Sequence, residues 1–313
     1  MLKVWEEYVV PQIQKGKLEV PEKFDFTAYL KTMDTILDFP INKRIDRVEL
    51  ELYTYLDLYP EIEKKIWSNA AEIFIGSHPI GSINASVLEC SEKKFLILLN
   101  EGLINFVQAV TTWCISAIYE VEKQDGNLDK LRHSIRNKAA VYLKGYKEQS
   151  VLIEDYTLQP SPEELYLINR ITNGSLKFAI AHELGHIAND DFASEKFEKF
   201  NLAAYSVNRY TKTKEKEFEA DKFAYHLLHK INKNYATDVD LEFQISGILM
   251  LFWSLDLLEW VEGNNRKSLT HPSIEDRGER IVSYIDKDLL HEFELPAQLE
   301  DIFNWIFEDF SIN

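Results

Sequence analysis

Residues 176–187 have the sequence Leu-Lys-Phe-Ala-Ile-Ala-His-Glu-Leu-Gly-His-Ile, an apolar and uninterrupted run that predicts a helix. On a helix, residues four positions apart lie one turn above each other on the same face. His182 and His186 can therefore offer two imidazole nitrogens to one zinc ion. Glu183 then lies beside the open coordination position of the metal. Its carboxylate can accept a proton from water there and pass it to a leaving amine.

A third ligand is required, because a catalytic zinc ion takes three protein ligands and keeps one position for water. Residues 216–224, Lys-Glu-Phe-Glu-Ala-Asp-Lys-Phe-Ala, are predicted to form a second helix. We predict Glu217 as the third ligand. Asp221 shares its helix face and is predicted to accept a hydrogen bond from a ligand imidazole, which fixes the tautomer. Glu219 points elsewhere and is predicted to be a solvated charge, while the small Ala220 permits close helix contact.

Each of these two segments also has a simpler explanation when it is considered alone. The His-Glu-x-x-His pattern arises by chance in about one per cent of chains of this length, given average residue usage. The acidic segment by itself is typical of a solvated surface helix. Their occurrence in one chain, with the acidic segment downstream of the histidines, favours the metal site.

The composition limits the classes of partner. The chain has 313 residues, a formal net charge of −17 and 45% hydrophobic residues, which is enough for a substantial core. The acidity argues against nucleic acid and against anionic membrane surfaces as partners, and it favours solubility. Two widely separated cysteines, and an N-terminus without an apolar signal core, predict a cytoplasmic location. Residues 245–261 are the most membrane-like segment, but Asp256 and Glu259 within it favour a buried helix of a soluble protein.

The order of predicted elements indicates an α+β fold that is predominantly helical. Short strands are predicted at residues 72–76, 85–90 and 94–100. Helices dominate from Pro160 onward, beginning with Ser161-Pro162-Glu163-Glu164, a good helix start. We therefore expect a zincin-like helical core with a small sheet beside the active-site helix.

Two features of this organisation stay open at the level of sequence. The aromatic residues of segment 190–215 predict a further packed helix, and the alternative is a cover over the active-site cleft. Residues 1–69 are predicted as an N-terminal helical elaboration and residues 70–313 as the metallopeptidase domain. No composition shift marks a clean boundary, so a single domain is the alternative.

Three segments in this order, His-Glu-Leu-Gly-His, Glu-Phe-Glu-Ala-Asp and Thr-His-Pro-Ser-Ile-Glu-Asp-Arg at 270–277, resemble the gluzincin metallopeptidases of the HtpX and CAAX-prenyl-protease type. The resemblance implies that Glu217 is the third zinc ligand. It also implies that His271 lies near the zinc, where it would stabilise the oxyanion, and that Arg277 holds the acids behind the ligands. The simpler alternative for His271 is an ordinary loop histidine before a proline that starts a helix.

Those enzymes carry several transmembrane helices, whereas the composition of this chain is typical of a soluble protein. Its layout is most similar to the Lit-type phage-exclusion peptidases, in which an apolar helix also separates the second and third motifs. The ImmA/IrrE group shares the first two motifs but usually lacks Thr-His-Pro. Relatives bind substrate as an extra strand on a sheet edge, for which residues 85–90 or 95–100 are candidates. Both segments are equally compatible with core strands.

The sequence therefore predicts a zinc-dependent endopeptidase that acts on an intracellular protein or peptide, in phage exclusion or in stress regulation. One alternative is an ImmA/IrrE-like regulatory metalloprotein that acts on a repressor or partner protein. Another is a non-catalytic, zinc-stabilised interaction module. Glu183 argues against the last alternative, because a structural zinc site closes all four positions and needs no acid there.

Overall fold

The computed structural model describes residues 59–78, 82–122, 128–149, 160–193, 197–202, 205–210, 213–235, 238–261, 272–285 and 293–310, together with Val48, Glu49, Leu52 and Leu56. The helices described are α5 (Pro60–Asn69), α6 (Glu101–Glu122), α7 (Leu128–Gln149), α8 (Pro162–Ala188), α9 (Lys214–Tyr235), α10 (Asp238–Val261), α11 (Ile274–Tyr284) and α13 (Glu294–Phe307). The strands are β1 (Glu72–His78), β2 (Ala85–Ser91), β3 (Lys94–Asn100), β4 (Phe197–Leu202) and β5 (Tyr205–Tyr210). The predicted α+β, predominantly helical class is confirmed.

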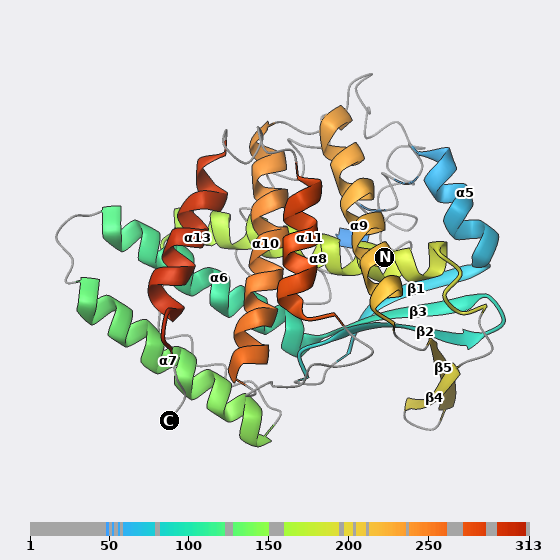
Figure 1. Cartoon of the computed structure of the whole chain (residues 1–313), viewed down its shortest axis with the longest axis horizontal. Coiled ribbons are helices and arrows are strands. Elements are labelled where there is room, and N and C mark those ends of the chain that lie inside the picture. Colours follow the sequence, from blue (N-terminus) through green and yellow to red (C-terminus); the bar gives the residue numbers. More distant parts are fainter. Residues whose placement is uncertain are drawn as a thin grey trace, which may run out of the picture.

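Helix α8 is the central element of the fold. It crosses behind α9, α10 and α11, and the sheet lies at its C-terminal end (Figure 1). Its start follows the predicted capping pattern. The Ser161 hydroxyl accepts a hydrogen bond from the Glu164 N–H at 3.3 Å, and the Glu164 carboxylate accepts one from the Ser161 N–H at 2.7 Å. Between residues 174 and 188 every side chain except Lys177 is buried, as expected for a helix that is surrounded by other elements.

Glycines allow α8 to lie directly against α10. A Cβ added to Gly247 would lie 2.5 Å from the Ile171 carbonyl oxygen and 2.7 Å from the Gly174 Cα. The hydroxyl of Ser175 donates to the Gly247 carbonyl at 2.6 Å, and Gln244 donates to the Gly174 carbonyl at 3.0 Å. The two backbones are therefore in contact, and buried side-chain hydrogen bonds fix their register.

The sheet has five strands in the order β1-β3-β2-β5-β4. β1 runs parallel to β3, β2 runs antiparallel to β3, and the last two strands form an antiparallel hairpin. Phe95, Ile97 and Leu99 of β3 point into the main core together with Val87 of β2. The three strands expected at residues 72–76, 85–90 and 94–100 are therefore confirmed.

The prediction of a helix in segment 190–215 is wrong. The segment contains β4 and β5, which extend the sheet beyond β2. Its aromatic residues recur at intervals that also suit a helix, but Phe197 lies opposite Tyr210 and Leu202 opposite Tyr205 across the hairpin. Strand pairing depends on a partner segment, which the spacing of aromatic residues within one segment does not reveal.

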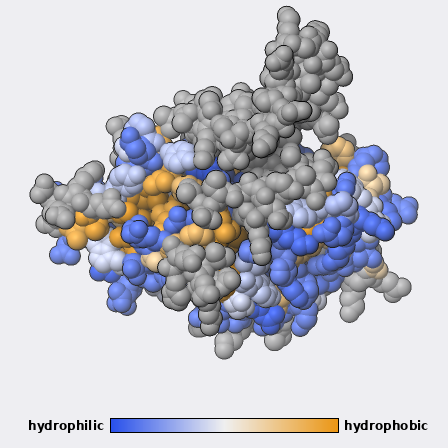
Figure 2. All heavy atoms as spheres, turned by 90° about the horizontal axis from the view of Figure 1, so that it is seen from above, coloured by the Kyte–Doolittle hydropathy of each residue, from blue (hydrophilic) through white to orange (hydrophobic). Residues whose placement is uncertain are grey.

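The described residues before Ala70 pack on the rest of the fold. Val48, Leu52, Leu56 and Ile66 are buried in the same core as α6, α8 and α10. On the surface, Lys230 of α9 forms a 2.9 Å ion pair with Glu61 of α5. Seen from above, the side on which α5 and α9 lie is largely hydrophilic, whereas hydrophobic residues gather on the side of α10 and α13 (Figure 2). The domain boundary at residue 69 stays a prediction.

Among the described residues, two helices are long and apolar enough to cross a membrane by length and composition alone. They correspond to Glu101–Val121 and Asp240–Trp260, and their most apolar windows are 83% and 67% buried inside the fold. The helix expected around residues 245–261 is thus present as α10, with Ile245, Leu249 and Phe252 in the core. Both helices supply core contacts to α8.

The contact between α8 and α10 predicts a large effect of one methyl group. Gly247→Ala would place its Cβ against the backbone of α8, so we expect a loss of about 1–3 kcal/mol in the free energy of unfolding. Gly278→Ala in α11 is the matched control, because its Cβ would meet only Phe252 at 3.8 Å. Urea unfolding checks this, with the control expected to be neutral or slightly stabilising. Equal stability of both variants would contradict the close contact.

Candidate metal centre

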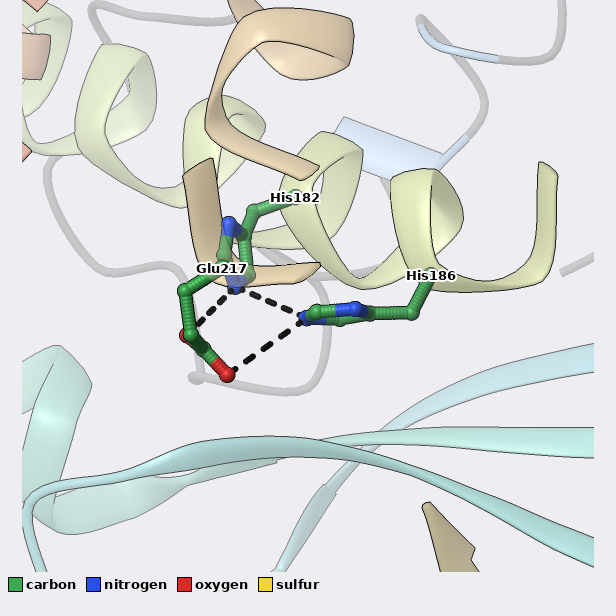
Figure 3. Close-up of side chains that lie close together, drawn as sticks. All are labelled: His182, His186 and Glu217. Atoms are coloured by element: carbon green, nitrogen blue, oxygen red, sulfur yellow. Dashed lines mark hydrogen bonds and ion pairs between the residues drawn. The ribbon is translucent and has the colours of Figure 1, made fainter. Parts of the chain in front are cut away.

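Three side chains converge between α8, α9 and the sheet (Figure 3). The Nε2 atoms of His182 and His186 are 3.1 Å apart. The Oε2 atom of Glu217 lies 3.5 Å from the His182 Nε2 atom, and its Oε1 atom lies 4.0 Å from the His186 Nε2 atom. All three residues are buried, and they form a candidate metal-binding triad.

These separations suit a tetrahedral zinc site. Zinc binds imidazole nitrogen and carboxylate oxygen at about 2.0–2.2 Å, so ligand atoms at tetrahedral angles lie about 3.4 Å apart. The three observed separations lie around that value. Two imidazoles and one carboxylate also form a donor set that catalytic zinc sites use, with the fourth position left for water.

Close contact between the two helices brings the ligands together. A Cβ added to Gly185 would lie 2.9 Å from the Ala220 Cα and 3.0 Å from the Ala220 carbonyl oxygen. Gly185 lies between the two histidines on α8, and Ala220 lies one turn beyond Glu217 on α9. Any larger residue at position 185 would therefore clash with the backbone of α9 at Ala220. The predicted role of Ala220 in close helix contact agrees with this geometry.

Asp221 and Arg277 form a charged layer behind His182. The Asp221 carboxylate lies 2.8 Å from the His182 Nδ1 atom. Arg277 donates to both oxygens of the same carboxylate, through Nε at 2.8 Å and Nη2 at 2.7 Å, and its Nη1 lies 3.6 Å from Glu217. Asp221 accepts from both groups, so Nδ1 of His182 carries a proton and Nε2 faces the metal position. The contacts predicted for Asp221 and Arg277 are present.

The buried charges shift the pKa values of this cluster. Burial alone would lower the pKa of the His182 imidazole, but Asp221 and Glu217 outweigh burial and raise it to about 9. Burial lowers the pKa of His186, and Asp191 offsets this only in part. Burial would raise the pKa of Asp221, but Arg277 and His182 lower it below its usual range. Asp221 is therefore an anion and His186 a neutral imidazole with a lone pair for a metal.

Asp191 belongs to this cluster, and our sequence interpretation did not include it. Its Oδ2 atom lies 2.7 Å from the His186 Nδ1 atom, and both side chains are buried. The signal in the sequence was the Asn189-Asp190-Asp191 run directly after the helix, since such residues end helices and accept hydrogen bonds. A carboxylate five residues after a ligand lies outside the i, i+4 spacing that identifies partners on one helix face.

Glu183 lies beside the triad with an unpaired oxygen. The residue is 3% exposed, and its Oε2 atom is buried without a hydrogen-bond partner among the described residues. A buried carboxylate oxygen that lacks a donor is costly unless a water molecule or a ligand binds there. The carboxylate of Glu183, which we predicted as the catalytic acid–base group, can therefore still accept a proton or a hydrogen bond.

A cleft of about 90 Å³ opens beside this carboxylate. His182, Glu183, Glu217 and Arg277 form its polar side, and its apolar lining includes Phe178, Leu103, Leu251 and Phe252. Asn84 and Ala85, at the start of β2, also line it. The cleft thus connects the metal triad to one strand of the sheet.

Only one of the two candidate edge strands has an open edge. β3 lies between β1 and β2, so residues 95–100 form a central strand and cannot take up a further strand. β2 pairs with β3 along its length but with β5 at only one position, Glu89 opposite Asn208. Among the described strands, residues 85–88 therefore pair on one side only, and that open side begins at the cleft.

Two further sequence predictions have different outcomes. Glu219 is exposed, as expected for a solvated charge, and lies outside the triad. His271 lies outside the described residues, so its proximity to the metal position stays a prediction. The helix expected after Pro272 is present as α11, which begins with Ser273 capping the Asp276 N–H at 3.0 Å.

The sequence model of the peptidase U49 family matches residues 113–293, which are more than half of the chain and include the whole triad. The chain belongs to the peptidase U49 family. Membership of this family makes the protein a peptidase, a hydrolase whose substrate is a protein or a peptide. A search of curated proteins finds no match, and a search of solved structures finds none either.

The triad predicts which acid of α9 binds the metal in this peptidase U49 member. We expect Glu217→Ala to lose the divalent metal ion, because two imidazoles remain and the carboxylate ligand is gone. Glu219→Ala removes an exposed carboxylate two residues away and is the matched control. Metal analysis of the purified variants after loading with zinc checks this. Metal loss in Glu219→Ala together with retention in Glu217→Ala would overturn the assignment.

Proposed function

We propose that the protein is a zinc-dependent endopeptidase of the gluzincin type, with His182, His186 and Glu217 as its zinc ligands. The observation that carries this proposal is the buried, unpaired Glu183 carboxylate oxygen beside a three-ligand cluster in a peptidase family. A structural zinc site fills all four positions with protein ligands and needs no acid beside an open position. The family match and this carboxylate therefore support an enzyme over a non-catalytic interaction module.

Each residue around the candidate metal site has a separate role in the proposed reaction. Zinc, when bound, would polarise the scissile carbonyl and make water a stronger nucleophile at neutral pH. Glu183 takes the proton from the attacking water and later delivers it to the leaving amine. Asp221 holds the tautomer of His182, and Arg277 keeps Asp221 ionised and in place. His271, by its resemblance to the family motif, is the proposed partner of the oxyanion.

The open side of β2 is the proposed binding place for the substrate backbone. An extended peptide beside residues 85–88 would pair its main chain with β2 as an added strand. Ala85 lines the cleft that contains Glu183, so a strand paired there leads directly to the reacting groups. The apolar lining of the cleft would receive a substrate side chain next to the scissile bond.

The biological role that we propose is cleavage of an intracellular protein in phage exclusion or stress regulation. The support is the resemblance of the motif order to the Lit-type peptidases, together with the peptidase U49 match. No structural observation favours the ImmA/IrrE-like alternative over this role.

The test separates catalysis from metal binding. We expect Glu183→Gln to keep zinc, because Glu183 is no ligand, and to lower peptide-bond hydrolysis by about 10²–10⁴-fold, the usual contribution of a positioned acid–base group. Comparison of new protein termini in cells that express the wild type or Glu183→Gln would also identify the substrate. Glu219→Gln is the control for the loss of one carboxylate. Termini that appear equally with wild type and Glu183→Gln would rule out this mechanism.

A further inference from the structure

The C-terminal end of α8 reverses the chain sharply. Asn189 follows the last helical residue, and Asp190 adopts a positive φ of 57°. The Asp190 N–H donates to the Ile187 carbonyl at 3.0 Å, and the Asp191 N–H donates to the His186 carbonyl at 3.1 Å. These two bonds are those of a Schellman turn, with Asp at the left-handed position that glycine usually takes. The turn folds residue 191 back over His186.

This reversal brings two buried polar side chains together. The Asp191 carboxylate is 2.7 Å from the His186 Nδ1 atom, and the imidazole is completely buried. A Schellman turn is often accompanied by an apolar contact between these same two positions, but here the contact is an imidazole and a carboxylate. A buried carboxylate in such a place needs partners of its own, because an isolated charge is costly to bury.

Three other elements hold the turn in place. Lys216 of α9 donates to the Asp191 carbonyl at 2.8 Å, and its Nζ lies 3.8 Å from the carboxylate. Asn69 of α5 donates to the Ile187 carbonyl at 3.0 Å. Phe192 packs edge-on against Phe95 of β3, with 4.9 Å between the ring centroids. The turn is therefore fixed by contacts with α5, α9 and the sheet.

We propose that Asp191 is the positioning residue for the second metal ligand, His186, and that this turn forms part of the metal centre. The inference rests on the proposed zinc site. Asp191 holds the proton of His186 on Nδ1, so that Nε2 keeps its lone pair toward the metal, and it makes that nitrogen a stronger donor. Lys216, which directly precedes Glu217, links the placement of Asp191 to the helix that supplies the third ligand.

The experiment measures zinc affinity of the full chain by competition with a chelator. We expect Asp191→Ala to bind zinc about 10–100-fold more weakly, the usual effect of removing the partner of a ligand imidazole. Asp191→Asn should bind with intermediate affinity, because its amide oxygen still accepts from Nδ1. Asp190→Asn is the matched control, since it is exposed and asparagine tolerates the positive φ, and it should bind zinc like the wild type.

A second measurement excludes a merely structural role. In the zinc-loaded wild type, ¹⁵N chemical shifts of the imidazoles should show His186 with its proton on Nδ1, and this signal should change in Asp191→Ala. If that variant fails to fold, Asp191→Asn and Lys216→Met provide the same comparison. Unchanged zinc affinity in folded Asp191 variants overturns the inference while the zinc site stands. If the wild type binds no zinc, the proposed function fails and the inference fails with it.

Discussion

The candidate metal centre depends on one backbone contact, that between Gly185 of α8 and Ala220 of α9. Packed helices are usually 8–10 Å apart, a distance that the side chains between them determine. Three ligand atoms from two helices must nevertheless come within about 3.4 Å of one another to share a zinc ion. Glycine facing alanine removes the intervening side chains at the crossing, so His182, His186 and Glu217 can converge without distortion. The glycine of the His-Glu-Leu-Gly-His motif is thus a packing requirement of the site.

Buried charge is the second constraint, and the arrangement of helices satisfies it. Glu217 and Asp221 are both nearly inaccessible to solvent, and each would be costly to bury alone. Arg277 from α11 contacts both carboxylates, while the imidazole of His182 shares Asp221 with it. The position of α11 is therefore as important to the site as that of the ligand helices. Removal of the guanidinium would take away the positive charge that both buried carboxylates contact.

The helical period in the sequence predicted which side chains share a face, and the structure brings these side chains together. His182, His186, Glu217 and Asp221 lie on known helix faces, so their convergence required only that two helices pack together. Segment 190–215 failed because its aromatic spacing also suits a helix, and only the pairing of Phe197 with Tyr210 decides for strands. Asp191 was not predicted because its contact with His186 depends on a reversal of the chain. The expected role of His271, stabilisation of the oxyanion near the metal, came from resemblance alone and stays a prediction.

The two glycine contacts of α8 have a consequence for how this peptidase can change during evolution. Gly174 touches α10 and Gly185 touches α9, so the helix is fixed at two points about 16 Å apart. A helix held in this way can neither slide nor rotate without moving its neighbours, so substitutions at these contacts would disturb the candidate metal ligands. The first residues of β2 also line the cleft but lie outside these close helix contacts. We therefore expect new substrates to arise through changes in β2, the proposed substrate-binding strand, while the helix that supplies two of the candidate metal ligands stays the same.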